Sequence, residues 1–427
     1  MKSGIKIVHW IITFWLCIII LRFNLIIDYI SLIIDYCKLI ISDPSIALNV
    51  LNYGFVDASF SSLLFILILP LIFIFRGRFR FLEAKLNLSG VFLILLCFVF
   101  LFAPIMTNEN PEFSKNLSVT KLLPPLSSIK QIELKEPEVK KLTQVDNFRN
   151  KAAKIIKPAF NIDIIFADSV IVTDKVIYFQ KNKSFIIDRE AIVSESGMPI
   201  VSNKLFLFGS DEFGRDLFAR LIYGTRISIT VGLGAVLLSF IIGILLGFIA
   251  GYRGGILDVS LNRFTEMFLA FPVIYLIVLI LALFGSSMIS VIVVLGISGW
   301  MSLFKIVKSE VLSIKHKDYF ATAELVGLNK FMILKREVFP VIITPVLVNL
   351  VFLFSNVVLA EAALSYLGLG TGNSYPSWGS MISSGQEYIT KAWWLIAFPG
   401  LALILTLFTF NTSGRNLGKV FNPKIKK

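Results

Sequence analysis

The chain has 427 residues, of which 56% are hydrophobic and 16% are charged, and its formal net charge is +13. A mean hydropathy of +0.81 and repeated apolar stretches near the ~20 residues that a spanning helix needs predict an all-α polytopic membrane protein and argue against a soluble domain. Much of the positive charge lies in short loops beside apolar segments, which is typical of membrane proteins and disfavours nucleic-acid binding. The cysteines lie in apolar segments, so no disulfide framework is predicted: Cys17, Cys37 and Cys97.

The amino-terminal region, residues 1–80, is predicted to supply extra membrane helices. The apolar run Ile7–Leu21 is followed by no small-residue cleavage pattern, so we interpret it as a retained anchor helix. The run Leu25–Ile41 carries three charged residues, and we expect it to be interfacial or packed against protein. Phe60–Phe75 is a predicted span. It ends in a basic cluster that should be cytoplasmic: Arg76, Arg78, Arg80 and Lys85.

A second region is predicted to leave the cytoplasm and to form a small domain outside it. Residues 81–106 contain the span Leu88–Met106, and residues 107–208 form a polar insert. Within the insert, Gln144–Lys157 favours a helix, and the runs SVIVTDKVIYF and KSFIID favour strands joined by a turn at Gln180–Ser184. We therefore predict a small extracytoplasmic β-rich insert, which could be a spacer or a ligand-contacting lid.

The segment SDEFGRDLFARLIYGTR joins the insert to the next apolar run. It places two acidic residues four positions before two arginines, a spacing that pairs opposite charges on one face of a helix. We predict a helix over Asp211–Arg226 that lies at the membrane surface, and an ordinary juxtamembrane role is an equal alternative. The candidate site residues on this periplasmic face are Asp211, Gly214, Arg215, Asp216 and Arg220.

The remaining apolar runs predict a packed set of spanning helices. Ile227–Tyr252 carries a small residue at every fourth position from Ala235 to Gly251, a pattern that lets another helix approach closely. Further spans are predicted at Met267–Phe284, Met288–Ile306, Val341–Ala363 and Ala392–Phe410. Three prolines lie in or at the ends of these spans and are candidates for kinks: Pro272, Pro345 and Pro399.

A polar unit, Asp318–Pro340, interrupts the apolar runs. Asp318 is a plausible N-cap of a short helix, and Gly327 can end that helix in the left-handed conformation. Asn329 can cap a second helix, which should stop before Pro340. Counting spans from the basic cluster places the polar unit in the cytoplasm, where it could contact a soluble partner or be a structural hairpin.

Several segments together resemble permease subunits of peptide-type ABC importers, of the OppC/DppC kind in the dipeptide, oligopeptide and nickel family. The matching segments are GSDEFGRDLFARLIYGTRISITVG, GFIAGYRGGILD, the polar unit, EAALSYLGLGTGNSYPSWGSMI and AWWLIAFPGLALILTLFTFN. The resemblance implies a six-helix permease core, with 81–106 as its first helix and 209–414 as the remainder. Residues 415–427 would be a basic cytoplasmic tail.

The resemblance also implies roles for particular residues. Residues 316–340 correspond to the coupling loop that docks on an ATP-hydrolysing subunit. The loop positions implied are Asp318, Ala321, Thr322, Ala323, Gly327 and Pro340. The glutamate that opens the family motif is absent here, so shape should matter more than that carboxylate. A close-packed turn near the receptor-facing mouth would contain Glu361, Gly368, Gly370, Trp378 and Gly379.

The motifs that are missing bear on mechanism. The sequence contains no phosphate-binding loop, because Gly418-Lys419 lacks the required frame, so ATP and Mg²⁺ are expected in partner ATPases. The two histidines, His9 and His316, are isolated and suggest no metal or catalytic cluster. We therefore predict no cofactor or catalytic residue in this chain.

The predicted function is that of a permease subunit of a peptide importer in the bacterial cytoplasmic (inner) membrane. Its expected partners are a second homologous permease, two cytosolic ABC ATPases and an extracytoplasmic solute-binding protein. Nickel or another small solute is an alternative cargo. A non-transporting membrane scaffold or sensor that keeps the permease fold is the competing class.

Overall fold

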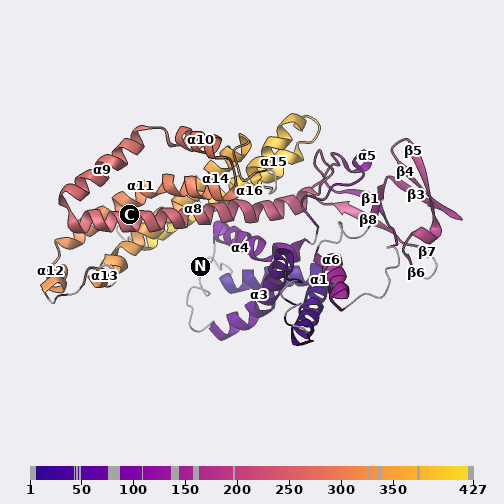
Figure 1. Cartoon of the computed structure of the whole chain (residues 1–427), viewed down its shortest axis with the longest axis horizontal. Coiled ribbons are helices and arrows are strands. Elements are labelled where there is room, and N and C mark those ends of the chain that lie inside the picture. The colour runs from indigo at the N-terminus through magenta and orange to yellow at the C-terminus, as the bar shows by residue number, and fades with distance from the viewer. Residues whose placement is uncertain are drawn as a thin grey trace, which may run out of the picture. The chain divides into compact units, whose positions relative to one another are not determined.

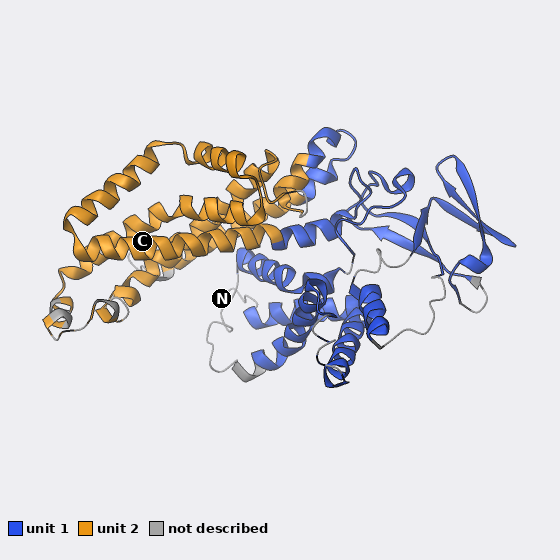
Figure 2. Cartoon of the chain, viewed as in Figure 1, with its two compact units in different colours: residues 1–226, 384–398 blue, residues 227–383, 399–427 orange. Residues whose placement is uncertain are grey.

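The computed structural model describes most of the chain as helices, with small sheets in one region (Figure 1). The described residues are 6–42, 44, 47, 50–75, 87–107, 109–135, 144–156, 163–195, 198–325, 327, 329–333, 336, 338–372 and 376–421. The predicted basic cluster at 76–85 and the end of the tail, 422–427, lie outside them. The chain divides into two compact units, Met1–Arg226 with Ser384–Phe398, and Ile227–Ser383 with Pro399–Lys427 (Figure 2).

Seven of the described helices are long and apolar enough to span a membrane, and a bent pair raises the count to as many as eight. The prediction of a polytopic helical membrane protein is thereby confirmed. The seven are α1 (Ile7–Ser42), α3 (Tyr53–Phe75), α4 (Leu88–Met106), α8 (Leu217–Arg253), α11 (Met288–Lys315), α14 (Phe339–Tyr366) and α16 (Trp394–Phe421).

In the first unit, α1, α3 and α4 pack together. The two amino-terminal runs form one helix, α1, with a kink at Arg22 (φ −131°, ψ 25°), where we expected two separate segments. Tyr29 Oη donates to the carbonyl of Pro104 at 3.0 Å, which ties α1 to α4. Arg226, in α8, makes two hydrogen bonds of 2.6 Å to the carboxylate of Asp57 in α3. Because a bidentate pair fixes both distance and orientation, the extra helices are firmly joined to α8.

The insert contains the predicted helix and hairpin. The helix is α6 (Gln144–Ile156), and the hairpin is β4 (Lys175–Gln180) with β5 (Lys183–Asp188). The run SVIVTDKVIYF divides into β3 (Ser169–Val172) and β4, which pair antiparallel. A second sheet has the order β2-β1-β8 and joins the two ends of the insert. Its strands are β1 (Ser127–Glu133), β2 (Ile164–Ala167) and β8 (Val201–Phe206). The shorter elements are α5 (Leu117–Thr120), η2 (Arg189–Ala191), β6 (Ser194–Glu195) and β7 (Met198–Pro199).

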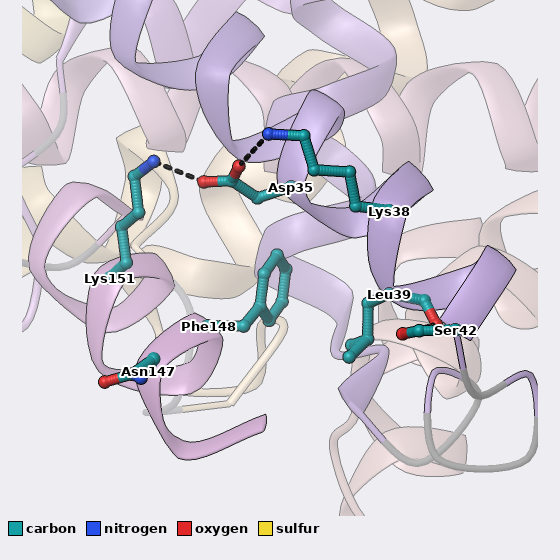
Figure 3. A pocket seen from close by; sticks show the side chains of 7 residues that line it. All are labelled: Asp35, Lys38, Leu39, Ser42, Asn147, Phe148 and Lys151. Atoms are coloured by element: carbon teal, nitrogen blue, oxygen red, sulfur yellow. Dashed lines mark hydrogen bonds and ion pairs between the residues drawn. The ribbon is translucent and has the colours of Figure 1, made fainter. Parts of the chain in front are cut away.

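Helix α6 packs against α1. Phe148 and Ala152 of α6 are buried in a cluster with Leu32 and Leu39 of α1. Beside this cluster Lys151 pairs with Asp35 at 2.5 Å. Figure 3 shows these charged side chains among the residues that line a pocket: Asp35, Lys38, Leu39, Ser42, Asn147, Phe148 and Lys151. The pocket has a volume of about 350 Å³.

In the second unit, α8 and α11 approach closely through the predicted stripe of small residues. A methyl group at Gly243 would lie 2.5 Å from Leu303 Cβ, and one at Gly247 would lie 2.7 Å from Val307 Cβ. The stripe therefore packs helices together, as predicted. Three short helices also belong to this unit: α12 (Asp318–Leu325), α13 (Lys330–Ile333) and α15 (Trp378–Gly385). The last two residues of α15 are assigned to the first unit.

The predicted span Met267–Phe284 is broken at Pro272, one of the three predicted kink positions. Two helices, α9 (Gly255–Ala270) and α10 (Val273–Phe284), meet there at 84°. Pro272 is the N-cap of α10, and the residue before it is extended (ψ 141°). A proline disfavours helical backbone in the residue that precedes it, which explains the break. By contrast, Pro345 and Pro399 lie inside α14 and α16.

Candidate functional site

The polar unit consists of two short helices between two spans, and most of its predicted local structure is confirmed. Gly327 follows α12 with φ +80°, the left-handed conformation that was expected. Asn329 Oδ1 accepts a hydrogen bond from the backbone N–H of Met332 at 2.7 Å and so caps α13. Asp318 is the first residue of α12 instead of its predicted N-cap, and its charge there complements the helix dipole. Thr322 Oγ1 donates to the carbonyl of Asp318 at 2.9 Å.

Pro340 and two alanines of the polar unit need separate comment. Pro340 lies in the first turn of α14, so it begins the next long helix instead of ending the second short one. This placement suits proline, which lacks the N–H that would be unsatisfied in a first turn. Ala321 and Ala323 lie in α12, but their side chains are outside the described part.

A buried aromatic side chain, which the sequence did not reveal, anchors the polar unit. Phe320 is 1% exposed and belongs to one apolar cluster with the ends of the long helices. Its partners in this cluster include Tyr252, Val311, Ile314, Ile333 and Val338. Lys315 Nζ also donates to the carbonyl of Tyr252 at 2.9 Å. The polar unit is thus fixed to the ends of α8, α11 and α14.

The opposite side of the polar unit presents an apolar side chain to solvent. Leu325, the last residue of α12, is 87% exposed, and Gly327 and Asn329 are exposed beside it. A leucine that is left exposed on a firmly anchored helix is available to a partner, which would gain stabilisation by burying it. Its signal in the sequence was an apolar residue two positions before the helix-ending glycine.

The predicted helix over Asp211–Arg226 is wrong in its first turn, because α8 begins only at Leu217. Residues before it form a turn in which Asp211 Oδ1 accepts hydrogen bonds from the backbone N–H groups of Phe213 and Arg215, at 2.9 Å each. Gly214 has φ +71°, which a helix does not allow. The ion pair between Asp211 and Arg215 is nevertheless present, with Arg215 Nε 2.6 Å from Asp211 Oδ2.

A glutamate about a hundred residues earlier completes this ionic cluster. Glu112 accepts hydrogen bonds of 2.6 Å from both Arg215 and Arg220. The four-residue spacing had predicted a pair between Arg220 and Asp216. Arg220 instead lies 3.6 Å from Asp211. Glu112 has no signal in the local sequence, since only the folded insert brings it to the arginines.

Asp216 has a different role from the one predicted. Its Oδ1 accepts hydrogen bonds from the N–H groups of Phe218 at 2.9 Å and Ala219 at 3.3 Å, so it caps α8. Lys204 Nζ lies 3.8 Å from the other oxygen and also pairs with Glu109. Burial raises the pKa of the Asp216 carboxyl, and Lys204 acts against this rise. Burial likewise raises the pKa of the neighbouring Glu212.

The turn before α8 is packed closely against two other segments of its unit. A methyl group at Gly214 would overlap Thr120, so only glycine fits there. Trp394 Nε1 donates to the carbonyl of Ser210 at 3.2 Å, and the rings of Phe208 and Phe398 stack with centroids 4.2 Å apart. The carboxyl-terminal end of the insert and the turn before α8, which we call the root of the insert (residues 208–216), are therefore fixed to the first residues of α16.

Four of the five residues predicted for the receptor-side turn lie after α14. We call the described residues of this segment, 367–372 and 376–383, the α14 turn. Glu361 instead lies inside α14, where it is 0% exposed. It accepts hydrogen bonds from Ser228 Oγ at 3.1 Å and from Ser365 Oγ at 2.7 Å. Trp378, also fully buried, begins α15, and its backbone N–H donates to Ser228 Oγ at 3.5 Å.

The glycines of the α14 turn explain its close contact with α14. A methyl group at Gly370 would overlap Ser365, and one at Gly379 would overlap the carbonyl of Ala362. Gly368 has φ +78° at the end of the helix. The structure thus brings the predicted residues together around Glu361, although they are spread over 19 positions.

The helices and these sites define a multi-pass helical membrane protein that carries an anchored polar unit between two spans. The chain belongs to the family of binding-protein-dependent transport system inner membrane components, whose family model matches residues 243–427. It is therefore a multi-pass inner-membrane transport permease. Family membership implies ABC transporter partners.

Three relatives illustrate the match. The chain is 35% identical over 221 residues to the dipeptide transport system permease protein DppC of Bacillus subtilis, covering 52% of this chain and 69% of that protein. It is 35% identical over 221 residues to the di/tripeptide transport system permease protein DppC of Pseudomonas aeruginosa, covering 52% and 73%. It is 36% identical over 217 residues to the oligopeptide transport system permease protein OppC of Haemophilus influenzae, covering 51% and 70%.

Proposed function

We propose that this chain is a permease subunit of an ABC importer that moves peptides across the cytoplasmic membrane. The observation that carries the proposal is the polar unit, in which Phe320 anchors one side while Leu325 is held out to solvent on the other. The names of the relatives, which are dipeptide, di/tripeptide and oligopeptide permeases, support peptides as the cargo.

In this proposal the polar unit lies in the cytoplasm and docks on an ATPase subunit. Two such subunits bind ATP and Mg²⁺ and hydrolyse the nucleotide, and a second homologous permease completes the pathway. A binding protein delivers the peptide on the opposite side of the membrane. Nucleotide binding then shifts the permease between two states through the docked polar unit, since a ligand can shift an equilibrium only by binding the two states differently.

The contacts of the polar unit suit such a docking role. Phe320 joins it to the ends of α8, α11 and α14, and Lys315 of α11 is bonded to Tyr252 of α8, so a force applied to α12 reaches three long helices at once. The absence of the family's first glutamate leaves the docking contact to shape and to apolar area. Leu325 supplies that area at the edge of α12.

The test is to purify the intact complex from the native membrane, identify the binding protein and its bound ligand, and reconstitute the complex in vesicles. We expect uptake of short peptides that requires both ATP and the binding protein. A complex that co-purifies with ATPases but transports only nickel would contradict the peptide assignment. A chain that recruits no ATPase would contradict the transport role itself.

A further inference from the structure

The strongest feature that the proposed function leaves unused is the buried carboxyl of Glu361. Burying a carboxyl inside a membrane protein is unfavourable unless its oxygens are hydrogen-bonded. Both oxygens are: Ser228 on α8 donates to one, and Ser365 on α14 donates to the other. Glu361 therefore joins two long helices through hydroxyl groups within the second unit.

The same carboxyl also reaches the α14 turn. Ser228 Oγ, which donates to Glu361, accepts the backbone N–H of Trp378 at the start of α15. A hydrogen-bonded chain thus runs from the turn through Ser228 to Glu361. Gly370 and Gly379 allow the turn to contact α14 next to this carboxyl, at Ser365 and Ala362.

Helix α14 connects this point with the polar unit. It begins at Phe339, within the last two residues of the polar unit, and continues to Tyr366 over 28 residues. At about 1.5 Å per residue it is about 42 Å long, enough to cross a bilayer with its headgroups. Val338 and Ile342, at its first end, share the apolar cluster of Phe320. One helix therefore contacts the polar unit at one end and the α14 turn at the other.

We propose that Glu361 is a positioning residue that fastens the α14 turn to α14, so that a movement begun at the polar unit reaches the receptor-facing side. This inference rests on the proposed function and adds to it a residue through which nucleotide-driven movement is transmitted. The turn then moves with α14, and the binding protein meets a surface whose position depends on the nucleotide state.

The experiment labels the turn in the reconstituted complex. Thr371 is 4% exposed in the turn, and Thr371→Cys is introduced into a chain whose native cysteines are replaced by serine. A membrane-impermeant maleimide then measures access from outside, with no nucleotide and with ATP trapped by vanadate. With Glu361 present, we expect labelling rates that differ several-fold between the two conditions. In Glu361→Ala we expect fast labelling that is equal in both conditions.

Coupling is measured in the same vesicles. Glu361→Ala should raise the ATP consumed per peptide imported by about 10-fold, within the usual range of coupling between sites. Glu361→Gln, which keeps one carbonyl acceptor, should restore much of the coupling. Ser228→Ala keeps the carboxyl but cuts the connection to Trp378, so it should also weaken the nucleotide dependence of labelling. It is the second variant if Glu361→Ala fails to assemble.

The matched control is Ser239→Ala, which removes another fully buried hydroxyl from α8, one that donates to Gly296 of α11 at 2.7 Å. It should preserve nucleotide-dependent labelling. If Glu361→Ala and Ser228→Ala keep normal coupling and nucleotide-dependent labelling, or if the control loses them equally, the inference is wrong. Failure of the unsubstituted complex to import peptide, with labelling still nucleotide-dependent, would contradict the proposed cargo and leave the role of Glu361 supported.

Discussion

A substitution series at Gly327 tests whether the shape of the polar unit determines docking. Gly327 has φ +80°, and a methyl group placed there would meet nothing within 4 Å. A side chain at this position therefore causes no clash, and its whole effect comes from the backbone. Left-handed backbone costs an ordinary residue about 1–2 kcal/mol and a β-branched one about 2–3 kcal/mol.

These energies set the expected order of the series. Because about 1.4 kcal/mol changes an equilibrium tenfold, Gly327→Ala should lower the docking-competent population roughly 5- to 30-fold. Gly327→Val should lower it roughly 30- to 150-fold by the same conversion. Gly327→Asn should lose least, since asparagine adopts this conformation more readily than other residues.

The assay titrates the purified permease with its ATPase subunit and compares binding with peptide uptake. The matched control is Gly285→Val, because Gly285 also has a positive φ (+86°) with open space, but it lies before α11, at the opposite end of that helix from the polar unit. It should leave ATPase binding unchanged. Equal binding by the asparagine and valine variants would refute the reasoning, since steric strain of the backbone would then not explain the role of Gly327.

Three further predictions concern other described residues. Leu325→Ala should weaken ATPase binding about 10- to 100-fold without affecting membrane insertion, because burying a leucine contributes about 1.5–3 kcal/mol; titration with the ATPase measures this. Phe320→Ala should destabilise the packing of the polar unit by about 3–5 kcal/mol, with Phe320→Leu milder, as measured by limited proteolysis of that unit. Burial raises the pKa of Asp216 above its ordinary 3.8, so the folded unit holds this proton more tightly than the unfolded chain. Stability should therefore fall as pH rises from the ordinary value through the raised one. Asp216→Asn, which keeps a capping oxygen, should flatten that dependence when thermal unfolding is measured at increasing pH.

Local patterns in the sequence predicted local structure well. The length of apolar runs identified the spans, and α4 has the predicted bounds, because a membrane helix satisfies its own backbone groups and depends little on distant residues. The alternation in SVIVTDKVIYF and KSFIID predicted a hairpin, and the end of the first run and the second run form the β4–β5 hairpin, whose loop is only two residues long. The left-handed glycine at position 327 was likewise a local property.

Features that depend on distant residues could not be predicted. Glu112 meets Arg215 and Arg220 only because the insert folds back on itself, and no local spacing indicates that contact. The four-residue spacing of acids and arginines suggested a helix, yet Gly214 and the capping role of Asp216 start the helix later. Glu361 was predicted in a turn because its motif was interpreted as one segment, whereas the helix continues to Tyr366 and buries it.

The root of the insert bears on the choice between a spacer and a lid. A passive spacer needs few contacts with the membrane part, but here β1 pairs with β8, so both ends of the insert are held in one sheet. Glu112 then joins its first residues to the turn before α8, and Trp394 joins that turn to the start of α16. Replacing any one contact would leave the others, so the root should move as one piece with the first turns of α8 and α16. An insert rooted in this way can carry a force from a bound partner to those helices, which a flexible spacer cannot do.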